Sequence, residues 1–264
     1  MAISRNERAN QILELVAKNS SIDVETAADA LKVSLATIRR DFDDLSNRQL
    51  VHRTHGGIQA IGASYDLPIR YKTAKDSKGK ARIAKYAAGL IERGARIGLN
   101  GGTTTTELAR ELARSPKFAP QDKSLGLTVV TNAVNIATEM VIRPNIKIVV
   151  TGGVARPQSY ELTGEYASAV LDGLVLDIAL LGVNGIDPVV GATANHEGEA
   201  RVDQMIADAS KEVIIVTTAS KIGQTGFARF CKPSQISKII TDDEIDPDLR
   251  KAFEDQGVEI IVCH

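Results

Sequence analysis

Residues 22–57 read IDVETAADALKVSLATIRRDFDDLSNRQLVHRTHGG, and this stretch decides the fold of the N-terminal part of the chain. Apolar residues recur at helical spacing on both sides of a short polar break at 32–33. Ser34 is a suitable N-cap for the second helix, which we expect to end near Asn47. Residues typical of a strand, a turn and a second strand follow. The pattern therefore predicts two short helices and a β-hairpin.

A further helix is predicted upstream of this stretch. Residues 5–18 carry apolar side chains at helical spacing, and residues 24–31 repeat the pattern after Asp23, which is a suitable N-cap. Together with the helix that follows Ser34, these segments form a small helical core. The hairpin completes a helix-turn-helix with a wing, a fold that can place one helix in the major groove of DNA.

The helix after Ser34 has two different faces. Ile38, Phe42 and Leu45 fall on one side and should pack against the other two helices. Because the first turn is small and hydroxylic, its backbone can approach a duplex closely, and its free N–H groups suit a phosphate. Arg40 is placed to form a bidentate pair with guanine. The candidate DNA contacts on this helix are Ser34, Ala36, Thr37, Arg39 and Arg40.

Acidic residues fill the second half of the same helix. Asp41, Asp43 and Asp44 follow the arginine pair directly. Since carboxylates repel phosphates, we expect these three side chains to oppose contact with DNA. The helix should therefore enter the groove through its first two turns and leave it after Arg40.

The hairpin at residues 50–58 supports the same hypothesis. Arg53 and His55 are expected to touch phosphates or the minor groove of double-stranded DNA. The formal net charge is −1, so the hypothesis depends on where the charges point rather than on their number. Two alternatives stay open: a solvated helical bundle with a surface hairpin, and a module that binds another protein.

From residue 81 onward, short apolar stretches alternate with amphipathic ones. Such alternation implies a mostly parallel sheet covered by helices on both faces. We assign 1–60 to the winged domain, 61–80 to a linker and 81–264 to this α/β domain. Strands are predicted at 96–99, 128–131, 146–151, 177–182, 213–218, 238–241 and 258–262. Helices are predicted at 103–114, 133–141, 164–174, 197–210 and 247–256.

Glycines and small polar residues follow five of the predicted strands. In a parallel sheet these positions share the carboxyl edge, where α/β proteins bind ligands. Glycines allow close backbone approach, threonines offer hydroxyls, and helix N-termini offer N–H groups to an anion. Lys221 adds a positive charge. This edge suits a phosphate carried by a small polyhydroxylated molecule. Arg156 and Arg229 add charge if they reach it, but both are equally compatible with an ordinary surface position.

The motifs resemble those of a known family. Residues 37–41 (TIRRD) and 53–57 (RTHGG) are similar to the winged helix-turn-helix of DeoR-family transcriptional regulators, with Phe42 in place of the usual Leu and Ile58 in place of the usual Ala. Residues 75–262 resemble the DeoR-type sensor domain. That resemblance implies a sheet related to those of ribose-5-phosphate isomerase, glucosamine-6-phosphate deaminase and CoA transferases.

The resemblance also implies a function. Family members typically bind a phosphorylated sugar or a related catabolic intermediate and do not turn it over. We therefore expect a repressor of a carbohydrate-use operon whose affinity for its operator is controlled by such a ligand. One departure concerns 217–219 (TTA), where the family often has an Asp a few residues before the lysine. By resemblance, effector contacts fall on Gly102, Thr103, Thr104, Thr105, Asn132, Gly153, Asn184, Glu199 and Lys221.

No catalytic centre is evident in the sequence. His196, Glu197 and Glu199 form a His/carboxylate cluster, which we expect to begin a helix or to contact the ligand. No paired-carboxylate arrangement stands out. We therefore expect no catalytic residue, no cofactor and no metal. The alternative is a sugar-phosphate isomerase or deaminase with a DNA-binding appendage.

The remaining features concern location and assembly. The N-terminus lacks the apolar segment of a signal peptide, and no apolar run is long enough for a membrane span, so we expect a cytoplasmic protein. Cys231 and Cys263 are expected to be reduced thiols. Because one recognition helix reads only a few base pairs, we expect a homo-oligomer, a dimer or a tetramer, on repeated half-sites.

Overall fold

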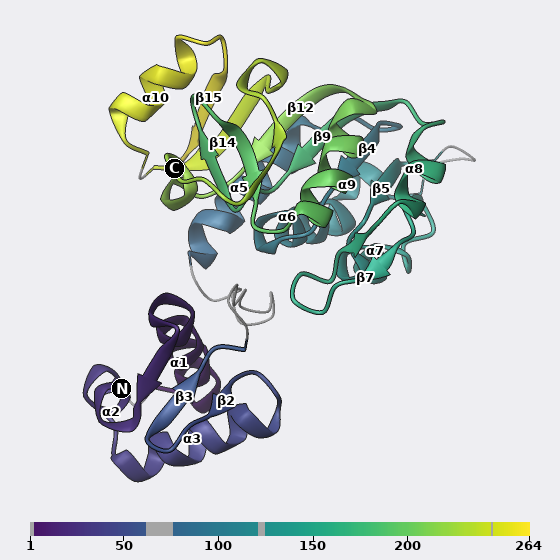
Figure 1. Cartoon of the computed structure of the whole chain (residues 1–264). Coiled ribbons are helices and arrows are strands. Elements are labelled where there is room, and N and C mark those ends of the chain that lie inside the picture. Colours follow the sequence, from purple (N-terminus) through teal and green to yellow (C-terminus); the bar gives the residue numbers. More distant parts are fainter. Residues whose placement is uncertain (1–2, 62–75, 121–124, 244) are drawn as a thin grey trace. The chain divides into compact units, whose positions relative to one another are not determined.

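The computed structural model describes residues 3–61, 76–120, 125–243 and 245–264 (Figure 1). The chain divides into two compact units, Met1–Lys75 and Asp76–His264. The first unit has one cluster of buried apolar side chains and the second has two. Among the described residues, no helix is both long enough and apolar enough to cross a membrane.

The first unit is a winged helix-turn-helix. The predicted helices and hairpin are confirmed, and a short strand that was not predicted joins the hairpin in an antiparallel sheet of order β1-β3-β2. This strand has three residues and one buried side chain, which is too little pattern to recognise. The elements are α1 (Arg5–Asn19), β1 (Ser21–Asp23), α2 (Val24–Leu31), α3 (Leu35–Asn47), β2 (His52–Arg53) and β3 (Gly57–Gln59).

Side-chain caps and one apolar cluster fix the helices of this unit. Asp23 accepts a hydrogen bond from the backbone N–H of Thr26 at 2.8 Å, and Ser34 accepts one from that of Thr37 at 3.2 Å. These caps begin α2 and α3 where they were predicted. The completely buried side chains of the core are Ile12, Leu13, Val16, Ala27, Ile38, Phe42, Leu45 and Ile58. Since α3 buries its apolar face, the opposite face lies outside the core.

The second unit is built on a parallel sheet in the order β15-β14-β12-β9-β4-β5-β6. All the predicted strands are confirmed, with small shifts at their ends. They are β4 (Arg96–Leu99), β5 (Leu127–Thr131), β6 (Ile146–Val150), β9 (Leu176–Leu181), β12 (Ser210–Val216), β14 (Lys238–Asp242) and β15 (Glu259–Cys263). Each strand is followed by a turn at the same edge of the sheet, as its parallel pairing requires.

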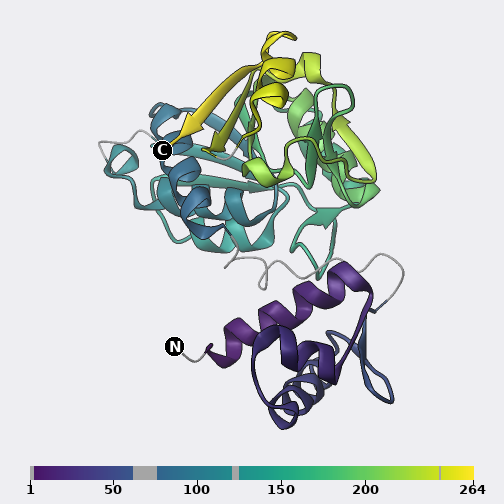
Figure 2. The same cartoon turned by 90° about the vertical axis from the view of Figure 1, so that its left-hand side faces the viewer.

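Helices cover both faces of the sheet (Figures 1 and 2). One apolar cluster joins Ile83, Leu108 and Ile136 to one face, and the other joins Leu171, Val202 and Phe253 to the opposite face. The first group is α5 (Ser77–Leu90), α6 (Thr103–Arg114) and α7 (Val134–Met140). The second group is α8 (Tyr166–Leu171), α9 (Glu197–Asp208) and α10 (Pro247–Glu254).

Short segments complete the second unit, and the sequence did not predict them. An antiparallel sheet contains β10 (Gly185–Asp187), β11 (Gly191–Ala194) and β13 (Ala228–Cys231), and a hairpin pairs β7 (Val154–Ala155) with β8 (Leu162–Thr163). These strands have two to four residues and lie in stretches rich in turn-forming residues. Single 3₁₀ turns lie at 116–118, 219–221 and 233–235.

The predicted linker 61–80 was too long at its C-terminal end. Helix α5 begins at Ser77, so residues 77–80 are helical. Gly79 lies inside this helix and next to the end of β14, where a Cβ would collide with the Asp242 carboxylate. The rest of the predicted linker, from residue 62 to residue 75, lies outside the described residues.

Candidate nucleic-acid interface and effector site

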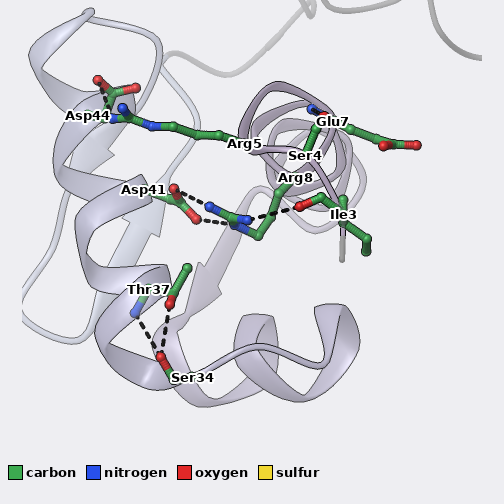
Figure 3. Close-up of polar contacts among 9 residues, drawn as sticks. All are labelled: Ile3, Ser4, Arg5, Glu7, Arg8, Ser34, Thr37, Asp41 and Asp44. Atoms are coloured by element: carbon green, nitrogen blue, oxygen red, sulfur yellow. Dashed lines mark hydrogen bonds and ion pairs between the residues drawn. The ribbon is translucent and has the colours of Figure 1, made fainter. Parts of the chain in front are cut away.

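The first two turns of α3 carry an exposed, positively charged surface. Arg39 and Arg40 are exposed, as are Ser34 and Ala36, while Thr37 is half-buried. The hydroxyls of Ser34 and Thr37 share a hydrogen bond of 2.9 Å at the helix start (Figure 3). The structure therefore brings together the five helix residues that the sequence singled out, on the side opposite the core.

Leu35 belongs to the same surface and was missed. It is the first residue of α3, and it is 41% exposed. It lies in the first turn of the helix, beside Ser34 and Ala36, and so adds an apolar group to this surface. The sequence could not indicate this exposure, because Leu35 lies three residues before Ile38 and seven before Phe42, which is the spacing of the buried face.

The three aspartates of α3, which were predicted to oppose contact with DNA, each pair with an arginine. Asp41 is buried and paired with Arg8, so its charge does not reach solvent. Asp43 pairs with Arg53 at 2.9 Å. The third, Asp44, pairs with Arg5 at 3.2 Å and with Arg48 at 3.0 Å. Each carboxylate is paired with an arginine of this domain. The spacing of Asp44 and Arg48 was visible in the sequence, but the pairs with Arg5, Arg8 and Arg53 were not, because those arginines lie on other elements.

Arg53, which was predicted to touch DNA, also makes contacts within the winged domain. Its Nε donates to Asp43, and its Nη1 donates to the carbonyl of Gly57 at 2.6 Å. The guanidinium also lies over the ring of Phe42, 5.5 Å from the centroid. These contacts hold the hairpin against α3. His55, in contrast, is exposed in the turn between β2 and β3. The wing therefore presents His55 outward and uses Arg53 as an internal tie.

In the second unit, polar loops meet at the carboxyl edge of the sheet. The Asn100 side chain, directly after β4, accepts a hydrogen bond from the N–H of Gly182 at 2.8 Å and donates to its carbonyl at 3.0 Å. Lys221 Nζ donates to the carbonyl of Val183 at 2.6 Å. The loops after β4, β9 and β12 are thereby linked at one place, as a ligand site at this edge requires.

The predicted effector residues divide into those at this edge and those turned inward. Thr103 is half-buried at the start of α6, whereas Thr104 and Thr105 are buried, and the Thr105 hydroxyl donates to the carbonyl of Gly102 at 3.2 Å. Asn184 is half-buried, and its Oδ1 accepts from the N–H of Asn195 at 2.9 Å. The side chains of Thr104 and Thr105 therefore serve the packing of α6.

Glycine is required at two of these positions. Gly102 has φ 139° and Gly153 has φ 134°, values that residues with a Cβ rarely adopt. At Gly153 a Cβ would also press against the backbone of Thr163. These glycines shape the loops after β4 and β6, and they leave backbone groups close to any ligand at the edge.

A buried carboxylate cluster lies behind these loops, and the sequence did not indicate it. Glu161 accepts from the N–H of Gly101 at 2.7 Å and from Asn132 Nδ2 at 3.3 Å. Asp203 accepts from Asn100 Nδ2 at 2.8 Å. Glu199, the third member, pairs with Arg156 at 3.2 Å, so this arginine faces the cluster rather than solvent. Arg229, by contrast, is exposed on β13.

Two carboxyl groups of the cluster have raised pKa values, and two of its buried oxygen atoms have no partner among the described residues. Burial, together with the nearby Glu199 carboxylate, raises the pKa of Glu161 to about 7. Burial also raises the pKa of Asp203 well above its usual range. Within the described part of the chain, Asn132 Oδ1 and Asp203 Oδ1 are buried and have no hydrogen-bond partner. Asn132 Oδ1 can therefore accept a further hydrogen bond, whereas Asp203 Oδ1 can donate when its carboxyl is protonated.

Residues 217–219 (TTA) lack the Asp that the family often has before the lysine, but a neighbouring strand provides a carboxylate. Asp242, at the end of β14, accepts a hydrogen bond from the N–H of Ala219 at 2.9 Å. A carboxylate thus lies beside the loop that carries Lys221, although it comes from a neighbouring strand. The departure from the family pattern therefore does not leave this loop without an acid.

His196 and the two cysteines lie in positions that agree with the sequence-based expectations. His196 is the N-cap of α9, where its Nδ1 accepts from the N–H of Gly198 at 3.1 Å, so the helix-start interpretation is confirmed. Cys231 and Cys263 are free and buried, and burial raises the pKa of Cys231 to about 12. Among the described residues, no group of His, Cys, Asp and Glu side chains is arranged to hold a metal.

A pH-dependent stability follows from Glu161. A carboxyl with a raised pKa binds its proton more tightly in the folded state, so its stabilising effect is complete below about pH 4.5 and falls until the pH passes about 7. We expect Glu161→Gln to reduce the loss of stability between pH 5 and pH 8, by an amount on the order of 3 kcal/mol or less. Urea unfolding followed by circular dichroism measures this change.

Glu165→Gln is the matched control for this prediction, because Glu165 is exposed and four residues away. The control should show the same pH dependence as the unmodified protein. Part of the dependence should survive in Glu161→Gln, since Asp203 contributes in the same direction. An identical pH dependence in Glu161→Gln and in the unmodified protein would show that Glu161 titrates normally.

The winged domain and the separate α/β unit define a class: a helix-turn-helix DNA-binding regulator with its own sensing domain. The model of the DeoR-like helix-turn-helix domain matches residues 8–63, and the model of the DeoR C terminal sensor domain matches residues 75–243. The chain therefore belongs to the DeoR family of transcriptional regulators.

Similar proteins match the chain over nearly its whole length. The "HTH-type transcriptional regulator GlpR" of Haloferax volcanii is 32% identical over 256 residues, covering 97% of this chain and 96% of that one. The "Glycerol-3-phosphate regulon repressor" of Escherichia coli K12 is 26% identical over 261 residues, covering 99% and 100%. Both relatives are named as regulators of transcription or of a regulon.

Similarity to solved structures is weaker. Ribose 5-phosphate isomerase A from Methanocaldococcus jannaschii aligns with a TM-score of 0.41 and 18% identity, covering 56% of this chain and 55% of that chain. A likeness of this size supports no conclusion about activity.

Proposed function

We propose that this protein represses a carbohydrate-use operon, and that a phosphorylated sugar or a related anion controls its affinity for the operator. One observation carries the proposal: an outward-facing arginine pair on a helix-turn-helix occurs in the same chain as a polar loop edge on a parallel sheet. The name of the Escherichia coli relative, a repressor that refers to glycerol 3-phosphate, supports both the direction of control and the kind of ligand.

The DNA contacts follow from the exposed surface of α3. The first turn approaches the duplex with the backbone of 34–37, where free N–H groups and the helix dipole favour a phosphate. Arg39 and Arg40 reach base edges or phosphates, and Leu35 contacts a thymine methyl. His55 lies at the backbone of the adjacent groove. In this arrangement Arg53 acts indirectly, by holding the hairpin that carries His55.

The effector contacts follow from the loop edge. Lys221 and the backbone N–H groups from Gly102 onward, with the Thr103 hydroxyl, provide the positive end for a phosphate. Asn184 and the buried acceptors of Asn132 take the hydroxyl end. Glu199 contributes to this site as a member of the carboxylate cluster. Gly153 lies in the loop after β6, at the border of the site. A polyhydroxylated ligand supplies the donor that Asn132 Oδ1 lacks.

Assembly and location complete the proposal. One recognition helix reads only a few base pairs, so useful specificity needs a dimer or tetramer that places two or more helices on repeated half-sites. The effector then acts by favouring an arrangement in which these helices no longer match the half-site spacing. Because its target is chromosomal DNA, we place the protein in the cytoplasm.

A thermal-shift screen against phosphorylated sugars tests the effector class. A ligand that binds only the folded protein raises its melting temperature by mass action, with about 2.7 kcal/mol of added stability at a concentration 100 times Kd. We expect a phosphorylated sugar to raise the melting temperature and the matched unphosphorylated sugar to leave it unchanged. Stabilisation by the neutral sugars alone would refute the anionic class, and turnover of a stabilising ligand would refute a purely sensory role.

A further inference from the structure

A buried ion pair joins the first helix of the winged domain to the middle of its recognition helix (Figure 3). Arg8, in the first turn of α1, donates from Nε to one carboxylate oxygen of Asp41 at 2.5 Å and from Nη2 to the other at 3.1 Å. The side chains of Arg8 and Asp41 are only 12% and 5% exposed. The two residues are 33 positions apart in the sequence, so the contact joins two separate elements.

The position of Asp41 on α3 determines which part of the helix this ion pair holds. It follows Arg40 directly, and it is buried on α3 together with Ile38, Phe42 and Leu45. Apolar packing is not directional, so it permits small rotations of a helix about its axis. A bidentate guanidinium–carboxylate pair is directional, and it fixes the helix at the turn that carries Arg39 and Arg40.

The other ion pairs of α3 are less able to do this. Asp43 and Arg53 are 61% and 33% exposed, and the arginine side chain that meets Asp44 from α1 is 65% exposed. Exposed pairs hold side chains weakly, because water and salt screen them. Among the described residues, the contact between Arg8 and Asp41 is the one buried ion pair between α3 and another element.

We propose that Asp41 is a positioning residue for DNA reading: with Arg8, it holds the recognition helix at the rotation that directs Arg39 and Arg40 into the groove. This inference rests on the proposed role of the two arginines. It assigns no DNA contact to Asp41 itself. It also accounts for an acidic residue next to the arginine pair of a DNA-binding helix, where a free carboxylate would repel the duplex.

The test compares specific with non-specific DNA binding. An operator duplex is first selected by the protein from a random-sequence pool, and a scrambled duplex of equal length serves as the non-specific probe. Unfolding of part of the sample lowers both affinities by the same factor, so the ratio of the two affinities does not respond to stability alone. A misdirected helix lowers the ratio, because base contacts are lost while phosphate contacts survive.

Two variants are measured, each as the full chain. Asp41→Asn keeps the shape of the side chain and removes its charge, and its matched control, Asp44→Asn, makes the same charge change on the same helix at a more exposed site. We expect the affinity ratio to fall about tenfold or more in Asp41→Asn and to stay near the unmodified value in Asp44→Asn. The second variant, Arg8→Met with Asp41→Leu, replaces the pair by apolar side chains that can stay buried.

The outcomes separate the possibilities. A folded Arg8→Met/Asp41→Leu protein with a lowered ratio supports the proposal, and one with an unchanged ratio overturns it, since the pair would then serve folding alone. If the double variant does not fold, Asp41→Asn decides: an unchanged ratio relative to Asp44→Asn overturns the proposal. Failure of the proposed function looks different, because Arg40→Ala would then leave the ratio unchanged as well.

Discussion

Replacing Arg40 by alanine should weaken binding to specific operator DNA by roughly 1–3 kcal/mol, about tenfold to a hundredfold, without destabilising the protein. Arg40 is exposed, and no ion pair of this side chain is present among the described residues, so its removal disturbs nothing inside the winged domain. The loss should be confined to the operator sequence, because a base contact is removed. Fluorescence anisotropy at a fixed salt concentration measures both affinities.

Arg48→Ala is the matched control for this prediction. Arg48 follows α3 directly, is also exposed, and pairs with Asp44 on its own helix. Its removal makes the same change in net charge at the far end of the recognition helix. We expect the control to lose little specific affinity. Equal losses in the two variants would mean that only total charge matters, and unchanged specific affinity in Arg40→Ala would remove Arg40 from base reading.

Replacing Lys221 by alanine should leave operator binding intact and abolish the response to the effector. Lys221 is half-buried in the loop after β12, and its ammonium group lies at the carbonyl of Val183, where the loops of the sheet edge meet. It is the full positive charge proposed for the phosphate. Coupling between linked sites is typically about 1–3 kcal/mol, which is a change of 5- to 150-fold in operator affinity on effector binding. That change should disappear in Lys221→Ala.

Lys211→Ala is the matched control, because it also removes a lysine, from β12 instead of from the loop that follows it. Lys211 lies near the start of β12, is exposed, and pairs with Asp177 at the opposite end of the strand from the loop edge. Titrating effector into each protein bound to labelled operator gives the coupling directly. A normal response in Lys221→Ala would show that another group holds the anion, and a lost response in both variants would point to a general defect of the sensor domain.

Regular elements could be predicted because their patterns are local. Ile38, Phe42 and Leu45 recur at the spacing of one helix face, and that spacing alone decided which side of α3 faces outward. The strands of the parallel sheet are short apolar runs between amphipathic stretches, so each was recognisable without its neighbours. Short strands such as β1 and β10 were missed, because two to four residues carry no period.

Contacts between distant residues could not be predicted. The sequence gives the charge of Asp41 but not its partner, which lies 33 residues away on another helix. For the same reason, a repelling role was assigned to an acid that is buried and paired. Glu161 is a similar case: it pairs with Ala133 in an isolated bridge and meets the N–H of Gly101 only because the β7–β8 hairpin brings it back to the sheet. Its shifted pKa comes from that burial.

Hydrogen–deuterium exchange on the full chain tests the central claim most directly, because one experiment reports on both surfaces. The selected operator should slow amide exchange at 34–40 and in the hairpin at 53–57, and a stabilising sugar phosphate should slow it in the loops at 100–105, 182–185 and 218–222. In the ternary mixture, protection at 34–40 should decrease. Operator protection that leaves 34–40 unchanged, or effector protection away from those loops, would contradict the account.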